Sequence, residues 1–227
     1  PLTAEPLAGF AAFLDGTQES RVADFAGTIP IVVGRTAAVV RARVERRMTT
    51  WGAGPLMRCR LYAPLQLLPS GIRGELDVAG LDIHDTLNAN EEVSGHPLDL
   101  MSRAVHAVQD DRQALERDLA EEWARSTRAP LFVDGGLPSG EQASVSPWCV
   151  GVVKSHHTLY LHGDGLGVVL GLAVGERTSA FQIERTWGPE VVSWYLRLRP
   201  PPSHDPFWGL VRVEVARTPE LSARATL

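Results

Sequence analysis

One long amphipathic segment, Leu98 to Ser126, most constrains what this chain can fold into. Pro97 precedes the segment, and proline is common at the start of helices. Strand-like sequence lies on both sides, so we predict a single α/β domain over residues 1–227, with helices flanking a mixed sheet. Apolar residues recur along the segment at the spacing of one helix face: Met101, Val105, Val108, Leu115, Leu119 and Trp123.

Strand patterns fill most of the remaining chain. The alternating, β-branched segment Ile29–Met48 predicts either two strands joined near Gly34 or one long strand. Further strands are expected at Met57–Ala63 and around Leu76–Ile83. The glycine-rich segment Gly163–Gly171 lacks the spacing of a dinucleotide-binding loop and shows no clear helix start, and the chain has no Walker lysine loop. After the helix, the expected strand segments read LFVDGG, SPWCVGVVKS, TLYLH, FQIER, VVSWYLRL and GLVRVEV.

Composition excludes several classes of protein. Of the 227 residues, 44% are hydrophobic and 22% are charged, and the formal net charge is −5, which together predict an ordinary folded core. Two cysteines, Cys59 and Cys149, provide neither a disulfide framework nor a zinc site. We therefore expect an intracellular, cytoplasmic protein in which any metal has oxygen or imidazole ligands. The longest uncharged apolar stretch, Gly165–Gly175, is shorter than the roughly 20 residues of a membrane helix, so no membrane contact is expected.

In two segments a short apolar run ends in an aspartate, and a glycine follows directly. They are FLDGT, with Asp15, and FVDGG, with Asp134. An isolated Asp-Gly pair is most often only a turn, and that interpretation stays open for each copy. Two copies at the ends of buried strands also suit a metal site, because adjacent carboxylates repel unless a divalent cation neutralises them.

Helix geometry suggests a third carboxylate. The strand that ends at Asp134, with its lead-in, is about 16 Å long. A helix antiparallel to it covers the same length in about 11 residues, and counting that number back from Ser126 reaches Leu115 and Glu116. Glu122 lies closer to the centre of the apolar stripe but about 9 Å further along the axis, so it ranks second. The alternative for Glu116 is a solvated carboxylate paired with Arg112 one turn earlier.

Three carboxylates from two strands and one helix are what a two-metal, phosphodiester-cleaving site requires. Oxygen ligands of this kind suit magnesium or manganese, and the absence of a cysteine cluster excludes the common structural zinc sites. The sequence therefore predicts a metal-dependent hydrolase of phosphodiesters.

In the order and spacing of these motifs, the chain resembles the NurA nuclease family, whose domain has a ribonuclease-H-like fold. The matching motifs are FLDGT, a long helix with a glutamate, LFVDGGL, GVVKS, YLRL and VRVEV. The resemblance implies that Asp15, Glu116 and Asp134 bind manganese, with magnesium as the other candidate. It also implies that Lys154, the only lysine of the chain, contacts the scissile phosphate or a ligand carboxylate.

Members of the family are homodimers that cut single-stranded DNA and digest DNA ends, and they work with the hexameric HerA ATPase in repairing double-strand breaks. The resemblance therefore implies DNA, a HerA-type translocase and a second copy of the chain as partners. The family pattern continues past the VRVEV-like strand into a further helical segment, whereas this sequence stops at Leu227. We expect either a missing C-terminal segment or a shortened member, and a late catalytic histidine or tyrosine cannot be assigned.

Arginines offer a candidate surface for DNA. Residues 35–60 contain seven arginines and one acid, and strand alternation predicts that Arg41, Arg43 and Arg47 share one face. An ordinary solvated strand face is the alternative. The net acidic charge of the whole chain argues against strong nucleic-acid binding, unless metal ions bind the phosphates directly and a partner helps to hold the DNA.

The histidines are weaker candidates. Strand alternation would place His156 and His162 on one face of a strand and His157 on the other. Two imidazoles without a third ligand are usually polar surface residues rather than a metal site. His204 lies in a proline-rich loop, where ordering the loop is a simpler role than catalysis.

Two other functions remain open. One is a noncatalytic assembly or adaptor domain on the same fold, which would use its aromatic residues as a protein interface. The other is a ribonuclease-H-like enzyme that acts on RNA or on an RNA–DNA hybrid. The aromatic residues of the adaptor interpretation are Trp194, Tyr195, Phe207 and Trp208.

Overall fold

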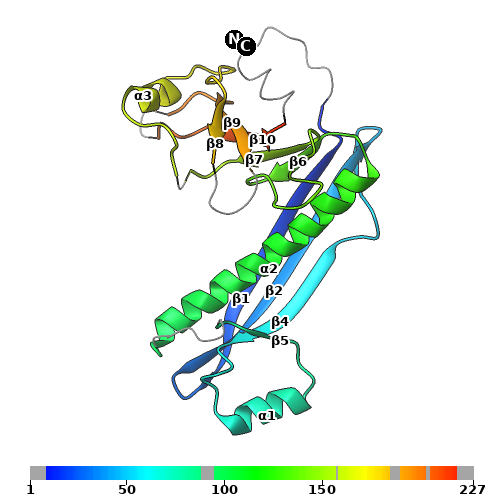
Figure 1. The fold of residues 1–227 in the computed structure, drawn as a ribbon, viewed down its shortest axis with the longest axis vertical. Coiled ribbons are helices and arrows are strands. Elements are labelled where there is room, and N and C mark those ends of the chain that lie inside the picture. Colours follow the sequence, from blue (N-terminus) through cyan, green and yellow to red (C-terminus); the bar gives the residue numbers. More distant parts are fainter. Residues whose placement is uncertain (1–8, 88–94, 157, 185–189, 203–204, 219–227) are drawn as a thin grey trace. The chain divides into compact units, whose positions relative to one another are not determined.

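The structure is a computed structural model, and it describes residues 9–87, 95–156, 158–184, 190–202 and 205–218. Within these residues it is a mixed α/β protein with ten strands and three helices (Figure 1). The strands are β1 (Ala12–Ala26), β2 (Ile29–Val44), β3 (Arg47–Thr50), β4 (Leu56–Ala63), β5 (Ile83–Asp85), β6 (Leu131–Asp134), β7 (Cys149–Val153), β8 (Phe181–Ile183), β9 (Val191–Arg197) and β10 (Leu210–Ala216). The helices are α1 (Ser70–Val78), α2 (Pro97–Ser126) and α3 (Asp164–Leu170).

The chain divides into two compact units, and β1, β2 and α2 each contribute residues to both. The prediction of one domain over the whole chain stays a prediction. Unit 1 comprises Pro1–Asp15, Val40–Gly52 and Arg117–Leu227, and unit 2 comprises Gly16–Val39 and Ala53–Glu116.

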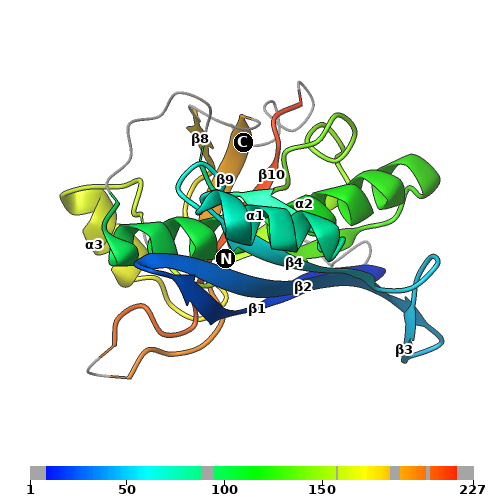
Figure 2. The same ribbon diagram turned by 90° about the horizontal axis from the view of Figure 1, so that it is seen from below.

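The sheet of unit 1 combines parallel and antiparallel pairs. The start of β1 pairs in parallel with β6, and β6 pairs in parallel with β7. From β7 onward the pairs β7–β10, β10–β9 and β9–β8 are all antiparallel. All seven residues of β10 are buried, which identifies it as a central strand of this unit. Also in unit 1, β3 folds back on the end of β2 as a hairpin (Figure 2).

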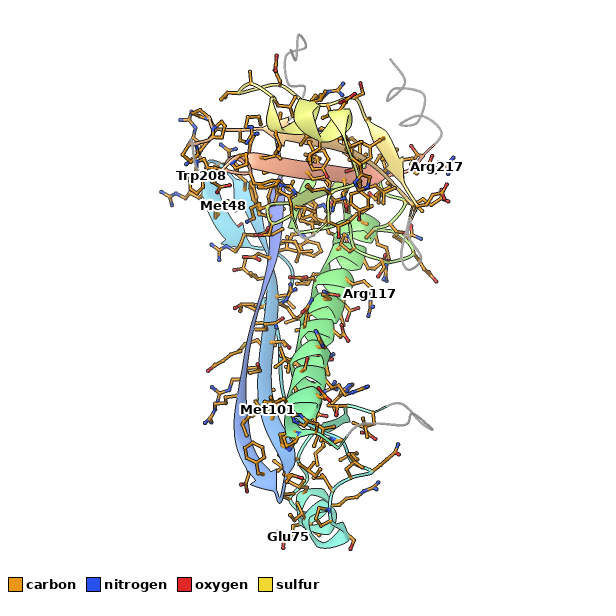
Figure 3. All side chains as sticks on the ribbon, turned by 90° about the vertical axis from the view of Figure 1, so that its left-hand side faces the viewer. Met48, Glu75, Met101, Arg117, Trp208 and Arg217 are labelled. Atoms are coloured by element: carbon orange, nitrogen blue, oxygen red, sulfur yellow. The ribbon has the colours of Figure 1, made fainter. Side chains whose placement is uncertain are left out.

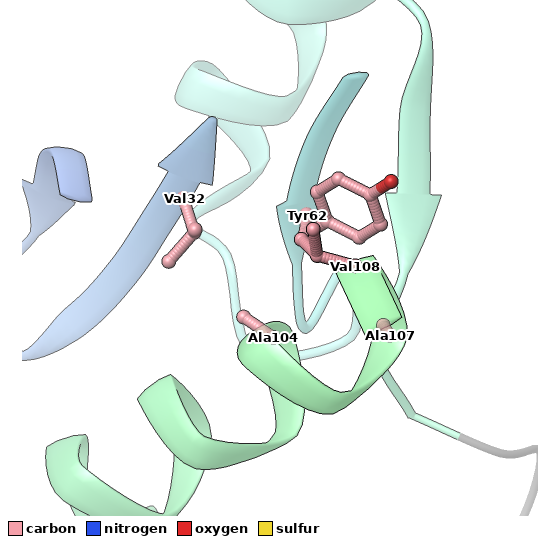
Figure 4. Close-up of a cluster of buried hydrophobic side chains, with 5 residues drawn as sticks. All are labelled: Val32, Tyr62, Ala104, Ala107 and Val108. Atoms are coloured by element: carbon pink, nitrogen blue, oxygen red, sulfur yellow. The ribbon is translucent and has the colours of Figure 1, made fainter. Parts of the chain in front are cut away.

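In unit 2 the first part of α2 packs on one face of the strands. β2 pairs with β4 in antiparallel register, and β4 pairs in parallel with β5. The views in Figures 1 and 2 agree that α2 covers one face of β2 and β4. Gly34 permits this contact, since a Cβ there would collide with Tyr62 and Val108. The contact is a cluster of buried side chains (Figure 4): Val32, Tyr62, Ala104, Ala107 and Val108.

The sequence predicts the long helix and most strands correctly. The helix is observed at Pro97–Ser126, and four of its six predicted stripe residues are buried, while Val105 is 42% exposed. The strand predicted at Met57–Ala63 is β4, and the last three predicted strand segments contain β8, β9 and β10. No helix within the described residues is long and apolar enough to span a membrane.

Three local predictions are wrong. The segment Ile29–Met48 is not among them, because its one-strand alternative is confirmed as far as Val44: the chain reverses at Glu45 and Arg46, which have positive φ angles of 48° and 66°, and not near Gly34. The strand expected around Leu76–Ile83 is mainly the end of helix α1, followed by the short strand β5. TLYLH forms no strand in the part that is described, and Gly163–Gly171 contains helix α3.

Candidate functional site

Asp134 lies at the end of β6, as the sequence predicts. Its strand pairs in parallel with β7, with Asp134 opposite Val152. The next residue, Gly135, has a φ angle of 121°, a conformation that residues with a Cβ rarely adopt. The chain then passes so close to β7 that a Cβ at Gly151 would lie 2.6 Å from the Leu137 nitrogen. Two glycines on neighbouring segments thus allow the sharp turn that follows the Asp134 carboxylate.

Asp15 is not at the end of a strand, which corrects the sequence prediction. β1 continues through Asp15 and Gly16 to Ala26, and this Asp-Gly pair forms no turn. β1 and β6 pair in parallel as far as Leu14 and Val133, so the next residue of each strand is Asp15 and Asp134 respectively. Residues at matching positions of parallel strands project to the same face, and the strands are about 4.8 Å apart. The two aspartates therefore leave neighbouring strands of unit 1 at the same level.

Lys154 contacts the second of these carboxylates. It directly follows β7, and its Nζ lies 2.5 Å from Asp134 Oδ2. The side chain of Asp134 is 27% exposed and that of Lys154 is 57% exposed, so the pair is open to solvent on one side. The ammonium group therefore compensates the charge of Asp134 at a position that a ligand can still reach.

Glu116 packs against β1 within unit 2. A Cβ at Gly16 would collide with the Glu116 carboxylate, so the missing side chain at Gly16 makes room for it. Arg112 donates a hydrogen bond to Glu116 Oε1 and, through Nε, a second one to Gln18 Oε1 at 2.9 Å. The pairing with Arg112 is thus present, but the Glu116 side chain is only 12% exposed and is not a solvated surface carboxylate.

Glu122, the second-ranked helix carboxylate, lies elsewhere. It is exposed, and its Oε1 is 4.0 Å from the position that a Cβ at Gly52 would take, within unit 1. Glu116 packs instead against Gly16, the residue that follows Asp15 in the chain. The choice of Glu116 over Glu122 as the helix carboxylate stays a prediction.

The donor chemistry of Asp15, Glu116 and Asp134 fits a hard divalent cation, because all three supply carboxylate oxygens. Two of the three carboxylates are held by a cation of the protein, Asp134 by Lys154 and Glu116 by Arg112. In the part of the chain that the structure describes, no three His, Cys, Asp or Glu side chains form a group that could hold a metal ion. The binding of manganese or magnesium is therefore a matter for proposal.

The three arginines predicted to share a face do not. In the hairpin of β2 and β3, Arg43 lies opposite Met48, whereas Arg47 lies opposite Val44. Directly opposed residues share a face, so Arg47 is on the face opposite to Arg41 and Arg43, because the chain reverses at Glu45 and Arg46. Arg41 also donates hydrogen bonds to Thr50 Oγ1 at 2.9 Å and to the Met48 carbonyl at 2.6 Å. A role of these arginines in DNA binding stays a prediction.

His156 is part of a packed cluster. Its Nε2 lies 3.1 Å from the Leu210 carbonyl oxygen, and its ring packs against the rings of Tyr195 and Phe207. Burial, with a smaller contribution from two nearby arginines, lowers the pKa of His156 below its ordinary value. His162 is exposed and shares no strand with it. His157 and His204 lie outside the described residues.

Sequence reasoning missed a buried ion pair that supports the loop after Asp134. Glu214 on β10 is completely buried, and its Oε2 accepts a hydrogen bond from the Leu137 nitrogen at 2.9 Å. Its Oε1 lies 2.5 Å from Nη1 of Arg212, whose guanidinium group also stacks on the Tyr160 ring at 4.7 Å. The alternation of VRVEV is typical of a strand with one solvated face, and only the burial of every residue of β10 reveals this pair.

Comparison with known proteins gives no family for this chain. No model of a known protein family matches it, and no curated protein is significantly similar to it.

Proposed function

We propose that this protein is a metal-dependent nuclease, with the activities of an end-processing exonuclease and a single-strand endonuclease acting on DNA. The observation that carries the proposal is the parallel register of β1 and β6, which brings Asp15 and Asp134 to the same level of neighbouring strands. Carboxylates at the same level of neighbouring strands repel each other when both face the same site, and a divalent cation relieves that repulsion. Lys154 at Asp134 adds a positive charge beside them, as the binding of a phosphodiester requires.

Each residue has a distinct part in this proposal. Asp15 and Asp134 would hold manganese or magnesium, and Glu116 is the helix carboxylate that the NurA resemblance implies. Such an ion, when bound, lowers the pKa of a water ligand and neutralises charge on the phosphate. Lys154 exchanges its contact with Asp134 for one with a phosphate oxygen of the substrate. Arg112 holds the Glu116 carboxylate in its rotamer against Gly16.

A ribonuclease-H-like fold is the arrangement that we propose for this chain. Three features support it: β1 is followed by β2 and β4 in an antiparallel set, a long helix comes next, and the strand after that helix returns parallel to β1. A catalytic carboxylate on β1, one on the helix and one at the end of β6 is the distribution that the NurA resemblance implies.

We also propose a partner protein and a cellular location. The chain has no nucleotide-binding loop of its own, so translocation along DNA would depend on a separate HerA-type ATPase. Together the two proteins would process the ends of double-strand breaks in the cytoplasm.

The direct test is cleavage of labelled single-stranded DNA by the purified chain. We expect cleavage with Mn²⁺, weaker cleavage with Mg²⁺, and none in EDTA, because the carboxylates then bind no metal. An RNA strand and an RNA–DNA hybrid are assayed in parallel. Cleavage of the RNA substrates alone would favour the ribonuclease alternative, and no cleavage of any substrate with either metal would favour the noncatalytic adaptor.

A homodimer is the assembly that we propose, and an apolar groove in unit 1 supports it. The groove, of about 530 Å³, runs over β6, β7, β9 and β10 and is lined by residues such as Phe132, Trp194 and Val213. Tyr195 cannot contribute to any interface, because its side chain is completely buried. This burial removes one of the four aromatic residues of the adaptor interpretation.

A charge in this groove should dissociate the dimer. We expect light scattering to give the wild type twice the 24.7 kDa mass of one chain. The variant Trp194→Glu should have the mass of one chain, because dimerisation would bury the new carboxylate without a partner. Val168→Glu is the matched control, since Val168 is 60% exposed on α3 and is not part of the groove. A monomeric wild type at micromolar concentration would contradict this assembly.

A further inference from the structure

A second pocket of unit 1 lies beside Lys154. Its volume is about 480 Å³, and it is formed by the segment after β7 and the turn between β9 and β10. Because Lys154 both lines this pocket and contacts Asp134, the pocket adjoins the candidate catalytic carboxylate. Its lining includes Lys154, His156, Arg199, Phe207, Trp208 and Leu210.

Two aromatic side chains of this pocket are unusually open to solvent. Trp208 is 53% exposed and Phe207 is 39% exposed, although they are adjacent in the chain. Trp208 lies in the turn just before β10, and Arg217 directly follows the other end of that strand (Figure 3). Neighbouring exposed aromatic rings are uncommon on a surface without a ligand or partner, so they indicate a binding surface.

The turn that carries these rings is held firmly. Arg197 is completely buried, and its guanidinium group donates hydrogen bonds to the carbonyls of Pro206 at 2.9 Å and Trp208 at 2.7 Å. Asp205 Oδ1 accepts a hydrogen bond from the Phe207 nitrogen at 3.0 Å. Gly209 closes the turn with a φ angle of 70°, where a Cβ would lie 2.7 Å from the Arg199 carbonyl. The backbone that carries the rings is therefore held in place by hydrogen bonds, which reduces the entropic cost of ordering this turn on binding.

Positive charge accompanies the rings. Lys154 and Arg199 both line the pocket, whereas the carboxylate of Asp205, its one acidic residue, bonds to the backbone of the turn. Aromatic faces next to cationic side chains are the combination that binds a base together with its phosphate. Paired bases in a duplex are already stacked on their neighbours, so such a pocket selects an unpaired nucleotide.

We propose that this pocket binds an unpaired nucleotide of a single-stranded nucleic acid, with its base stacked on Trp208 and Phe207 and its phosphate at Lys154 and Arg199. The inference rests on the proposed nuclease function and extends it, since it assigns the recognition of an unpaired base to the pocket lined by Lys154, the residue that contacts Asp134.

The test measures binding rather than cleavage. Fluorescence anisotropy measures the binding of four labelled ligands, all in EDTA at one salt concentration. They are an oligodeoxythymidine, an oligouridine of the same length, a duplex, and a deoxyribose-phosphate strand without bases. We expect Trp208→Ala to weaken binding of both single strands about tenfold or more, the range for loss of one stacked base. Binding of the duplex and of the strand without bases should not change. Trp208→Tyr should restore most of the affinity, because tyrosine keeps a stacking face.

Trp148→Ala is the matched control, because Trp148 is also exposed in unit 1 but lies before β7 and outside this pocket. Equal losses in Trp148→Ala and Trp208→Ala would overturn the proposal. So would unchanged binding in Trp208→Ala, an equal loss on the strand without bases, or a wild type that binds no single strand, which would leave the rings as a protein interface. Base-dependent binding without cleavage under any metal would refute the nuclease function alone, and cleavage with unchanged binding in Trp208→Ala would refute this pocket alone.

Discussion

Replacement of Asp134 by asparagine should reduce cleavage of single-stranded DNA by about 1,000-fold. A bound metal ion contributes several kcal/mol of charge stabilisation to the transition state, and each 1.36 kcal/mol changes the rate tenfold. The amide keeps the size of the side chain but not the charge that binds metal and pairs with Lys154. Because the Asp134 side chain is partly exposed, the fold should persist, and single-turnover cleavage with Mn²⁺ is the measurement.

The matched control is Asp164→Asn, which makes the same chemical change at an exposed position of α3. We expect this variant to cleave DNA at the wild-type rate. Circular dichroism and thermal unfolding of both variants separate lost chemistry from lost structure. Full activity of Asp134→Asn with Mn²⁺ would show that the metal is bound elsewhere or that none is needed.

The sequence predicted those parts of the fold that depend on local patterns. The 30-residue helix α2 has a continuous apolar stripe, and β6 is a short apolar run closed by Asp134 and a glycine, so both follow from spacing alone. The same argument placed Asp134 at a turn, whereas the contact of Lys154 with a carboxylate was implied only by the family resemblance. Local pattern is enough here because each feature is complete within one segment of the chain.

Predictions that depended on packing between segments were wrong. The Asp-Gly pair at Asp15 was interpreted as the end of a strand, but Gly16 lies within β1 and gives room to Glu116, which comes from a helix about 100 residues later. Arg47 was placed with Arg41 because alternation was extended through a turn of two non-glycine residues. Neither a distant side chain nor a turn without glycine leaves a signal in the local sequence.

The charges of β10 show the same limit. Arg212 and Glu214 alternate with valines, which is the usual pattern of a strand with one solvated face. In the folded chain both faces are covered, and the two charges pair with each other and with neighbouring backbone. A buried pair of this kind stabilises the fold only while both partners are present.

Replacement of Arg212 by methionine should therefore destabilise the protein by about 3–5 kcal/mol, the usual cost of removing one member of a buried ion pair. Glu214 would keep its hydrogen bond from Leu137 but lose the guanidinium group at 2.5 Å. Urea denaturation of the wild type and the variant measures the difference. The control is Arg217→Met, just beyond the same strand, where the pair with Glu190 is exposed and should contribute no more than about 1 kcal/mol.

The double variant Arg212→Met, Glu214→Met distinguishes the effect of the buried charges on stability from the effect of the loop after Asp134 on cleavage. Two apolar side chains of similar size leave no unpaired charge, so most of the lost stability should return. The Leu137 nitrogen, however, would have lost its acceptor three residues after Asp134. We therefore expect the double variant to unfold at nearly the wild-type urea concentration and yet to cleave DNA more slowly. If stability stays as low as in Arg212→Met alone, the cost comes from packing around Tyr160 rather than from the broken ion pair.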